Sequence, residues 1–214
     1  PIIRMSWVDG MTLGEFIYTK YRDAKALSLL QKKIRELFFY LHSRDFAHGD
    51  IQPGNIIVSK YTNNLILVDY DGMFIPEIDH LGSHEIGHIN FQHPKRTIKN
   101  FSKKLDFFSF ILLDVSLECL KHNADLWDQS FSDEEGILFR AEDLRNPLNS
   151  PIFYILSQTK NCHELAQDFA SICLSSFDNI PNPKDFYSGY NAEKKKFQFH
   201  PIQKKIKPKI LTKK

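Results

Sequence analysis

Two carboxylates and one amide stand close together in residues 47–72, which read AHGDIQPGNIIVSKYTNNLILVDYDG. Asp50 is followed by Asn55 five residues later and by Asp69 fourteen residues after that. Carboxylate and amide oxygens are the ligands that a hard cation such as Mg²⁺ prefers, whereas zinc favours sulfur and nitrogen. The residue types therefore predict a Mg²⁺ site at Asn55 and Asp69. Asp50 would lie close to the metal without being needed as its ligand.

A hairpin is the element that would bring these side chains together. Residues 56–58 and 65–68 are apolar, and a Thr-Asn-Asn connection lies between them. Aliphatic and β-branched runs on either side of an Asn-rich turn predict a short β-hairpin. Because a hairpin places its two ends side by side, Asn55 and Asp69 are predicted to be neighbours.

Two helices are predicted on either side of the hairpin. Residues 23–43 carry apolar side chains at the three- and four-residue spacing of one buried helix face, with charged residues between them. This helix would lead directly into the loop at His48. Residues 106–120 are apolar nearly all the way round, which predicts a helix inside the core. Asp106 is a good capping residue for its first turn.

The N-terminal residues predict a strand, a turn and a short helix. Residues 2–10 are mostly apolar and end at the turn signal Asp9-Gly10. Thr12 and Glu15 then form the pattern of a capping box, which predicts a helix over residues 13–18.

The second half of the chain is predicted to be less regular. Residues 126–151 have the charge clusters and the Asn-Pro pair of a loop, and a further helix is predicted over residues 162–177. Pro181 and Pro183 end the folded pattern. Residues 193–214 carry nine lysines and one glutamate, so the rest of the chain is mildly acidic. We interpret this segment as a disordered basic tail or linker, with nucleic-acid binding as the alternative.

Composition limits the class of protein. The chain has 214 residues, 42% hydrophobic and 25% charged, which is enough for one domain with a tail. No run of eighteen apolar residues is present, so no membrane span is predicted. The three cysteines, Cys119, Cys162 and Cys173, lie in apolar patterns and are predicted to be buried free thiols. Free thiols suit a reducing compartment, and we expect a cytoplasmic protein.

The pattern H-G-D-x-x-x-x-N from His48 to Asn55, the hairpin, and Asp69 ahead of Gly72 together resemble the catalytic and metal-binding loops of the protein kinase superfamily. The resemblance implies an α+β fold: a protein-kinase-like C-terminal lobe, mostly helical with short β-hairpins. It assigns residues 1–10 to a hinge strand and linker, residues 11–180 to the lobe, and residues 181–214 to the tail.

The resemblance also implies roles for single residues. Asp50 would be the base that accepts the proton of the acceptor hydroxyl, and Asn55 and Asp69 would hold Mg²⁺ on the phosphates of ATP. His48 would pack structurally. Asp106 would brace the backbone of the catalytic loop.

The nucleotide would be held by the segment before the first helix. Met5 falls at the gatekeeper position, and Ser6, Trp7 and Val8 would offer backbone groups to adenine. No Gly-rich loop and no strand Lys paired with a helix Glu precede these residues. We therefore expect the parent chain to supply a missing N-lobe, and this fragment alone to have little or no activity.

Several positions depart from the kinase pattern. Gly49 replaces the usual Arg, and Gln52 replaces a Lys that contacts the transferred phosphate in Ser/Thr kinases. Asp69-Tyr70-Asp71 replaces Asp-Phe-Gly, although Gly72 follows. H-G-D also occurs in small-molecule kinases such as aminoglycoside phosphotransferases. A Ser/Thr protein-kinase-like enzyme, favoured by the helix headed by Asp106, thus stands beside two alternatives: a small-molecule kinase and a pseudokinase binding module.

Histidines recur between the metal-binding loop and the second long helix, at positions 80, 84, 88 and 93. Their spacing raises the possibility of a zinc site, but Gly82, Gly87 and Pro94 interrupt any regular helix. We interpret them as loop histidines that pack against the catalytic loop. In the kinase resemblance this is the activation segment, and His93-Pro94 falls where its closing Ala-Pro-Glu would be.

Overall fold

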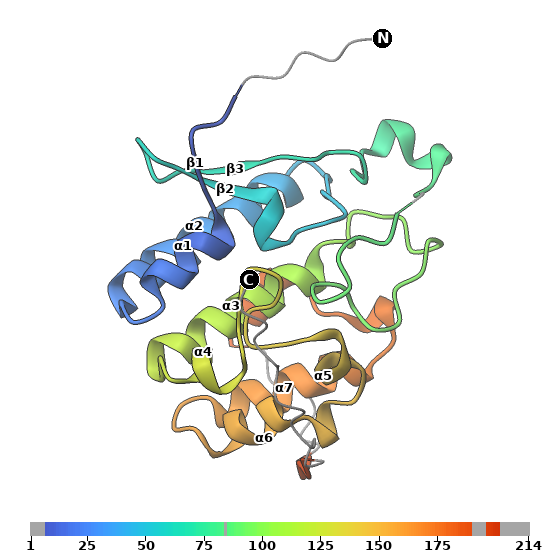
Figure 1. The fold of residues 1–214 in the computed structure, drawn as a ribbon. Helices are drawn as coiled ribbons and strands as arrows, with labels where there is room; N and C mark the ends of the chain where they lie inside the picture. Colours follow the sequence, from blue (N-terminus) through green and yellow to red (C-terminus); the bar gives the residue numbers. More distant parts are fainter. Residues whose placement is uncertain (1–6, 84, 190–195, 202–214) are drawn as a thin grey trace, which may run out of the picture.

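A small antiparallel sheet lies over a body of helices (Figure 1). This computed structural model describes residues 7–83, 85–189 and 196–201. The strands are β1 (Gly10–Thr12), β2 (Ile56–Ser59) and β3 (Leu65–Leu67), in the order β1-β2-β3. The mixture of helices with a small sheet is consistent with the predicted α+β class.

The predicted hairpin is confirmed. Strands β2 and β3 pair antiparallel, with Ile56 opposite Leu67 and Val58 opposite Leu65. Ile56, Val58 and Leu67 are buried, so one face of the hairpin contributes to the core. This buried face fixes the register, because a slip of one residue would turn its apolar side chains towards solvent.

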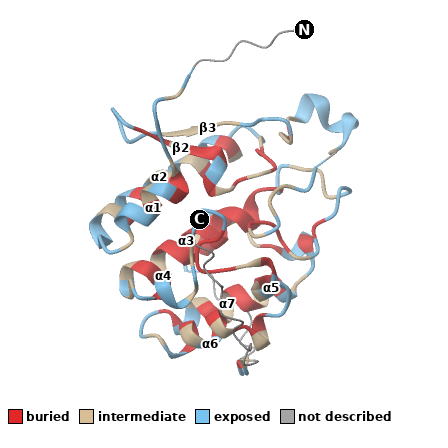
Figure 2. Ribbon diagram, in the orientation of Figure 1, coloured by how far each residue is buried: buried red, intermediate tan, exposed pale blue. Residues whose placement is uncertain are grey.

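The core is built on α2 (Ala24–His42) and α3 (Phe107–His122), which pack against each other. One face of α2 is buried, as its periodicity predicts. Helix α3 is buried along almost its whole length (Figure 2). Phe38 of α2 makes edge contacts with Phe107 and Phe110 of α3 at ring-centroid distances of 5.9 and 5.3 Å. These aromatic contacts add to the stability that burial provides.

Shorter helices complete the body; some of them contact α2 or α3, and others contact one another. They are α1 (Leu13–Lys20), α4 (Leu126–Gln129), α5 (Ala141–Arg145), α6 (Pro151–Gln158), α7 (His163–Leu174) and α8 (Pro183–Tyr187). Short 3₁₀ segments lie at Pro53–Asn55, Pro76–Leu81, Pro147–Asn149 and Phe177–Asn179.

The N-terminal prediction was correct for the helix and wrong for the turn. Thr12 and Glu15 form the predicted capping box of α1. Gly10, expected in a turn, instead begins β1 and lies opposite Ser59. Pairing with β2 overrides the local turn preference, and the Asp9 carbonyl already accepts a hydrogen bond from Lys60 N at 3.1 Å. Residues 2–6 of the predicted strand lie outside the described residues, and residues 7–9 are not part of a strand.

Two predictions for the second half need correction. Residues 126–151 were expected to be a loop, but α4 and α5 lie within them. Both are short, and tertiary packing of Leu126, Trp127 and Leu144 against the core stabilises them more than local propensity does. The helix predicted over residues 162–177 is shorter, because α7 ends at Leu174.

The segment after Pro181 is not simply a disordered tail. Helix α8 packs against α3. Phe199 is buried and stacks on Phe153 at 6.0 Å. Backbone N–H of Phe197 donates to Gln167 Oε1 at 2.8 Å. The basic composition predicted solvation, but the apolar residues between the lysines are sufficient to hold residues 196–201 on the body.

The cysteine prediction is confirmed, since Cys119, Cys162 and Cys173 are buried and free. Within the described residues, no helix is both long and apolar enough to cross a membrane.

Candidate active site

Asp50 lies at the centre of a set of hydrogen bonds. Its Oδ2 accepts from Gln52 Nε2 at 2.7 Å and from Asn55 Nδ2 at 3.0 Å. Its Oδ1 accepts from the backbone N–H of His88 at 2.7 Å. Two ionised carboxylate oxygens offer about four acceptor positions. Three are therefore in use, and the remaining one belongs to Oδ1.

The peptide group before Asp50 is held from both sides. The buried Asp106 carboxylate accepts from His48 N at 2.5 Å and from Gly49 N at 2.8 Å. The Gly49 carbonyl accepts from Arg96 Nη1 at 2.8 Å and from Gln92 Nε2 at 3.4 Å. The backbone entering Asp50 thus has little freedom to move.

Asp106 does not cap its own helix, contrary to the expectation that it would do so. Its side chain makes no capping hydrogen bond to α3, because the carboxylate is engaged by the loop at His48 and Gly49. Burial raises the pKa of the Asp106 carboxyl, and the two backbone hydrogen bonds act in the opposite direction. This contact is the bracing arrangement that the kinase resemblance implies.

The glycine at position 49 has a structural reason. Its φ is 85°, a left-handed value that residues with a Cβ rarely adopt. A Cβ there would also collide with the carbonyl oxygen of Gly72. The loop of Asp50 therefore contacts the loop of Asp69 through Gly49 and Gly72. This close contact explains why glycine replaces the usual Arg at position 49.

His48 is fully buried and joins the two loops. Its Nε2 donates to the Val68 carbonyl at 3.0 Å, and its Nδ1 accepts from Asp50 N at 3.4 Å. The ring also lies 5.6 Å from that of Tyr70. These contacts fit the structural role that the sequence predicts.

Asn55 and Asp69 lie at the same end of the hairpin. The Val68 N–H donates to the Asn55 carbonyl at 3.0 Å, so Asp69 is one residue beyond a paired position. Asp69 is exposed, its φ is 66°, and its carboxylate has no hydrogen-bond or ion-pair partner within the described chain. Oxygen ligands without protein partners suit Mg²⁺, which needs few of them when phosphates and waters complete its shell. The side chains of Asn55 and Asp69 are therefore suitable ligands for Mg²⁺.

The predicted nucleotide contacts are less constrained. Met5 and Ser6 lie outside the described residues. Trp7 is 91% exposed, and Val8 is half-buried ahead of β1. Gln52 Nε2 donates to Asp50 Oδ2 at 2.7 Å, and the contact with the nucleotide that the kinase resemblance implies for Gln52 stays a prediction.

Four residues to which the sequence analysis gave no role in the site contribute to it: Gly87 and His88, which it treated only as loop residues, and Gln92 and Arg96, which it did not name. They bind Asp50 or Gly49 from a segment about forty residues further along the chain. His88 was expected to pack against the catalytic loop, but its contribution is a backbone N–H. The detectable signal was Gly87, since an isolated glycine in a loop often marks close backbone approach.

The histidines do not form a metal site among the described residues, which contain no group of three potential His, Cys, Asp or Glu ligands. His84 lies outside them. His93 is buried, its Nε2 donates to the Ile172 carbonyl at 3.1 Å, and burial lowers the pKa of its imidazole. This supports the interpretation as packed loop histidines.

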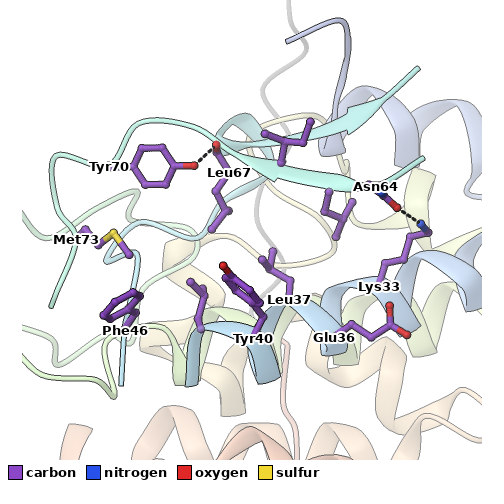
Figure 3. A pocket seen from close by; sticks show the side chains of 12 residues that line it. Lys33, Glu36, Leu37, Tyr40, Phe46, Asn64, Leu67, Tyr70 and Met73 are labelled. Atoms are coloured by element: carbon purple, nitrogen blue, oxygen red, sulfur yellow. Dashed lines mark hydrogen bonds between the residues drawn. The ribbon is translucent and has the colours of Figure 1, made fainter. Parts of the chain in front are cut away.

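A hollow of about 660 Å³ lies between α2 and β3, next to the loop that carries Asp69 (Figure 3). Tyr70 and Met73 at one end and Lys33 with Asn64 at the other mark its extent. Tyr70 Oη donates to the Leu67 carbonyl at 2.6 Å, and Lys33 Nζ donates to Asn64 Oδ1 at 3.1 Å. Most of the lining is aliphatic or aromatic, so this hollow is an apolar surface next to the Asp69 loop.

Known proteins share parts of this arrangement. Residues 1–80 match the family model of the ABC1 atypical kinase-like domain. Over 38 residues the chain is 45% identical to the probable serine/threonine-protein kinase FPV212 of fowlpox virus (strain NVSL). That match covers 18% of this chain and 12% of the viral protein. Together the two matches support a protein-kinase-like superfamily assignment.

Proposed function

We propose that this chain carries the catalytic loop of an ATP-dependent phosphotransferase whose acceptor is a Ser or Thr hydroxyl of a protein. The observation that carries the proposal is the Asp50 carboxylate, held in place by Gln52, Asn55 and His88. Phosphoryl transfer depends chiefly on positioning and electrostatics, and a fixed carboxylate is the group needed to orient the acceptor. Similarity to kinases supports the same reaction class.

Asp50 Oδ1 is the atom assigned to the proton. Oδ2 already accepts two side-chain amide hydrogens, whereas Oδ1 accepts one backbone N–H. An acceptor hydroxyl that donates to Oδ1 has its oxygen lone pair directed at the phosphorus. Because Gln52 and Asn55 fix Oδ2, the carboxylate does not rotate when the proton is transferred. This positioning lowers the entropic part of the barrier.

Asn55 and Asp69 would hold Mg²⁺ at the end of the hairpin. Bound Mg²⁺ supplies neutralisation of the charge on the phosphates of ATP. Within the chain, the Asn55 amide would link both halves of the site, because its Nδ2 donates to Asp50 while its oxygen remains for the metal. We extend the proposal to Trp7 and Val8 as part of the adenine site.

Transfer of phosphate from Mg²⁺-ATP by the full-length protein tests the proposal. Wild type is compared with Asp50→Ala and with Asp79→Ala, which removes an exposed carboxylate. We expect Asp50→Ala to lower kcat by about 10²–10⁴-fold, the usual contribution of a positioned base, and Asp79→Ala to leave it unchanged. Equal transfer by wild type and Asp50→Ala would remove the role given to Asp50. ATP binding without transfer by wild type would instead support a binding module.

A further inference from the structure

A second, smaller hollow lies on the Oδ1 side of Asp50. It has a volume of about 280 Å³ and lies between the segment 86–96 and α5. Both elements contribute to its lining, which includes Gly87, Arg96 and Arg145. Two of the lining residues are arginines and none is acidic. The hollow therefore presents positive charge without a compensating carboxylate in its wall.

Arg96 forms the buried part of this charge. It is 7% exposed, and its Nη1 donates to the Gly49 carbonyl and to Gln92 Oε1. Its Nε is buried without a hydrogen-bond partner. No carboxylate of the described chain lies within ion-pair distance of Arg96. Burial lowers the pKa of the guanidinium, while Asp106 and Asp50 act against this from further away. A buried cation in this state is stabilised by any anion that binds nearby.

Arg145 provides the exposed part of the charge. It is the last residue of α5 and lines the same hollow. It has no ion-pair partner among the residues that the structure describes. His93 adds no competing group, because its Nε2 is bound to the Ile172 carbonyl and its Nδ1 accepts from Lys95 N.

Gly87 joins the hollow to Asp50. It is a lining residue with φ 81°, and a Cβ at this position would lie 2.6 Å from Asp50 Oδ1. The next residue, His88, donates its N–H to the same oxygen. A ligand in the hollow is thus separated by Gly87 from the atom assigned to receive the acceptor proton.

A hydrogen bond joins the two walls of the hollow, and its volume suits a group the size of one side chain. Ala141 N donates to Asn90 Oδ1 at 2.9 Å, which ties α5 to the segment 86–96. Pockets for whole small-molecule ligands usually measure about 300–1,000 Å³, so 280 Å³ suits one side chain better than a nucleotide. Ile86, Ile89 and Leu144 offer apolar contact to the stem of such a side chain.

We propose that this hollow is an anion subsite for the acceptor: it binds a carboxylate or phosphate on the protein segment that presents its hydroxyl to Asp50. Arg145 contacts the anionic group at the mouth, and Arg96 supplies the buried positive charge behind it. The subsite rests on the proposed function for its purpose, but binding at the subsite does not require transfer to occur.

Binding of unreactive peptides tests the subsite directly. The probes are fluorescent peptides with Ala in place of Ser in a neutral background, carrying one Glu or one phosphoserine at each position from three before to three after it. Matched peptides carry Gln. For the full-length protein we expect about tenfold tighter binding of an acidic peptide at one or two positions, as a charge-assisted hydrogen bond provides. Comparing Glu with phosphoserine identifies which anion is preferred.

Substitutions test whether Arg145 causes the preference for acidic peptides. Arg145→Glu should abolish the acidic preference and favour Lys at the same peptide position, while Lys160→Glu, the same change of charge on the exposed surface near α6, should leave the preference intact. Arg145 is exposed, so folding should be unaffected, and thermal unfolding checks this. Equal binding of Glu and Gln peptides by wild type, or an acidic preference that Arg145→Glu retains, would overturn the subsite.

Transfer to the corresponding Ser peptides separates the two proposals. An Arg145-dependent acidic preference in binding, with no transfer to any peptide, would support the subsite and contradict the transferase function. Transfer without an acidic preference would support the function and contradict the subsite.

Discussion

Asp50 and Asp69 are the two carboxylates that sequence reasoning placed at the centre of this protein, and the fold treats them in opposite ways. Asp50 accepts three hydrogen bonds, and Asp106 and Arg96 hold the peptide that precedes it. Asp69 is exposed at φ 66° and has no hydrogen-bond or ion-pair partner in the described part of the chain. One carboxylate is positioned by the protein, and the other keeps its oxygens available.

The difference matches two different tasks. A proton acceptor gains from being fixed before the acceptor arrives, because reorganisation during reaction raises the barrier. A metal ligand gains from having no protein partner, because each such hydrogen bond would have to be broken when a cation binds. The left-handed backbone at Asp69 is a further cost that the fold accepts at this position. Substitutions on each side should therefore affect stability with opposite sign.

The largest effect is expected at Asp106. Asp106→Ala leaves the N–H groups of His48 and Gly49 buried without acceptors, and each unsatisfied group costs about 1–3 kcal/mol. We expect the free energy of unfolding to fall by about 3 kcal/mol in urea titrations, with loss of transfer. Asp106→Asn keeps one acceptor oxygen and should lose less. Wild-type stability of Asp106→Ala would show that Asp50 is not held through this contact.

A substitution at Gly87 attacks the Asp50 side directly. Gly87→Ala combines a strained φ of 81° with a Cβ 2.6 Å from Asp50 Oδ1, and we expect a loss of about 2 kcal/mol. Gly189→Ala is the control for strain alone. Its φ is 98° but no atom lies within 4 Å of its Cβ, so it should lose only about 1 kcal/mol. Equal losses in thermal unfolding would mean that the segment 86–96 yields freely around Asp50.

The Asp69 side should respond in the other direction. Asp69→Gly removes left-handed strain and breaks no hydrogen bond, but glycine loses more backbone entropy on folding, so we expect a net gain of only about 0.5 kcal/mol in unfolding free energy together with loss of transfer. Asp69→Ala keeps the strain and should give no gain. A destabilised Asp69→Gly variant would show that the carboxylate has a structural partner, and the contrast with Asp50 would fail.

The smallest effect is expected from His93, which binds the segment 86–96 to the Ile172 carbonyl of α7. Burial lowers the pKa of His93 in the folded state, so the unfolded chain binds its proton more readily. Stability from this group is complete above the unfolded pKa of about 6.5 and is lost as the pH falls through the folded value. The unfolding free energy of wild type should therefore fall more between pH 7.5 and pH 5.5 than that of His93→Gln. Parallel pH profiles would contradict this assignment.

Local patterns predicted much of the frame. The hairpin followed from two apolar runs around an Asn-rich turn, and α2 from its three- and four-residue spacing, because each pattern reports directly on one buried face. The motif from His48 to Asn55 singled out Asp50 within a continuous stretch. The capping box at Thr12 was equally local.

Contacts between distant segments were not predictable in this way. Nothing in the neighbourhood of Arg96 or Gln92 indicates that they bind the Gly49 carbonyl, about forty residues earlier. The packing of α8 and Phe199 on the body likewise depends on surfaces assembled by other helices.

The sequence by itself determined which residues are chemically able to act: two carboxylates and an amide, the hairpin that groups Asn55 with Asp69, and the helices on either side. The tertiary structure alone decided that Asp50 is held while Asp69 is free of hydrogen bonds within the described chain, and that two arginines line a hollow beside Asp50 Oδ1. The physical reason is the range of the interactions. Periodicity and turn preference act over a few residues, whereas hydrogen-bond partners and charge environments are set by segments that meet only after folding.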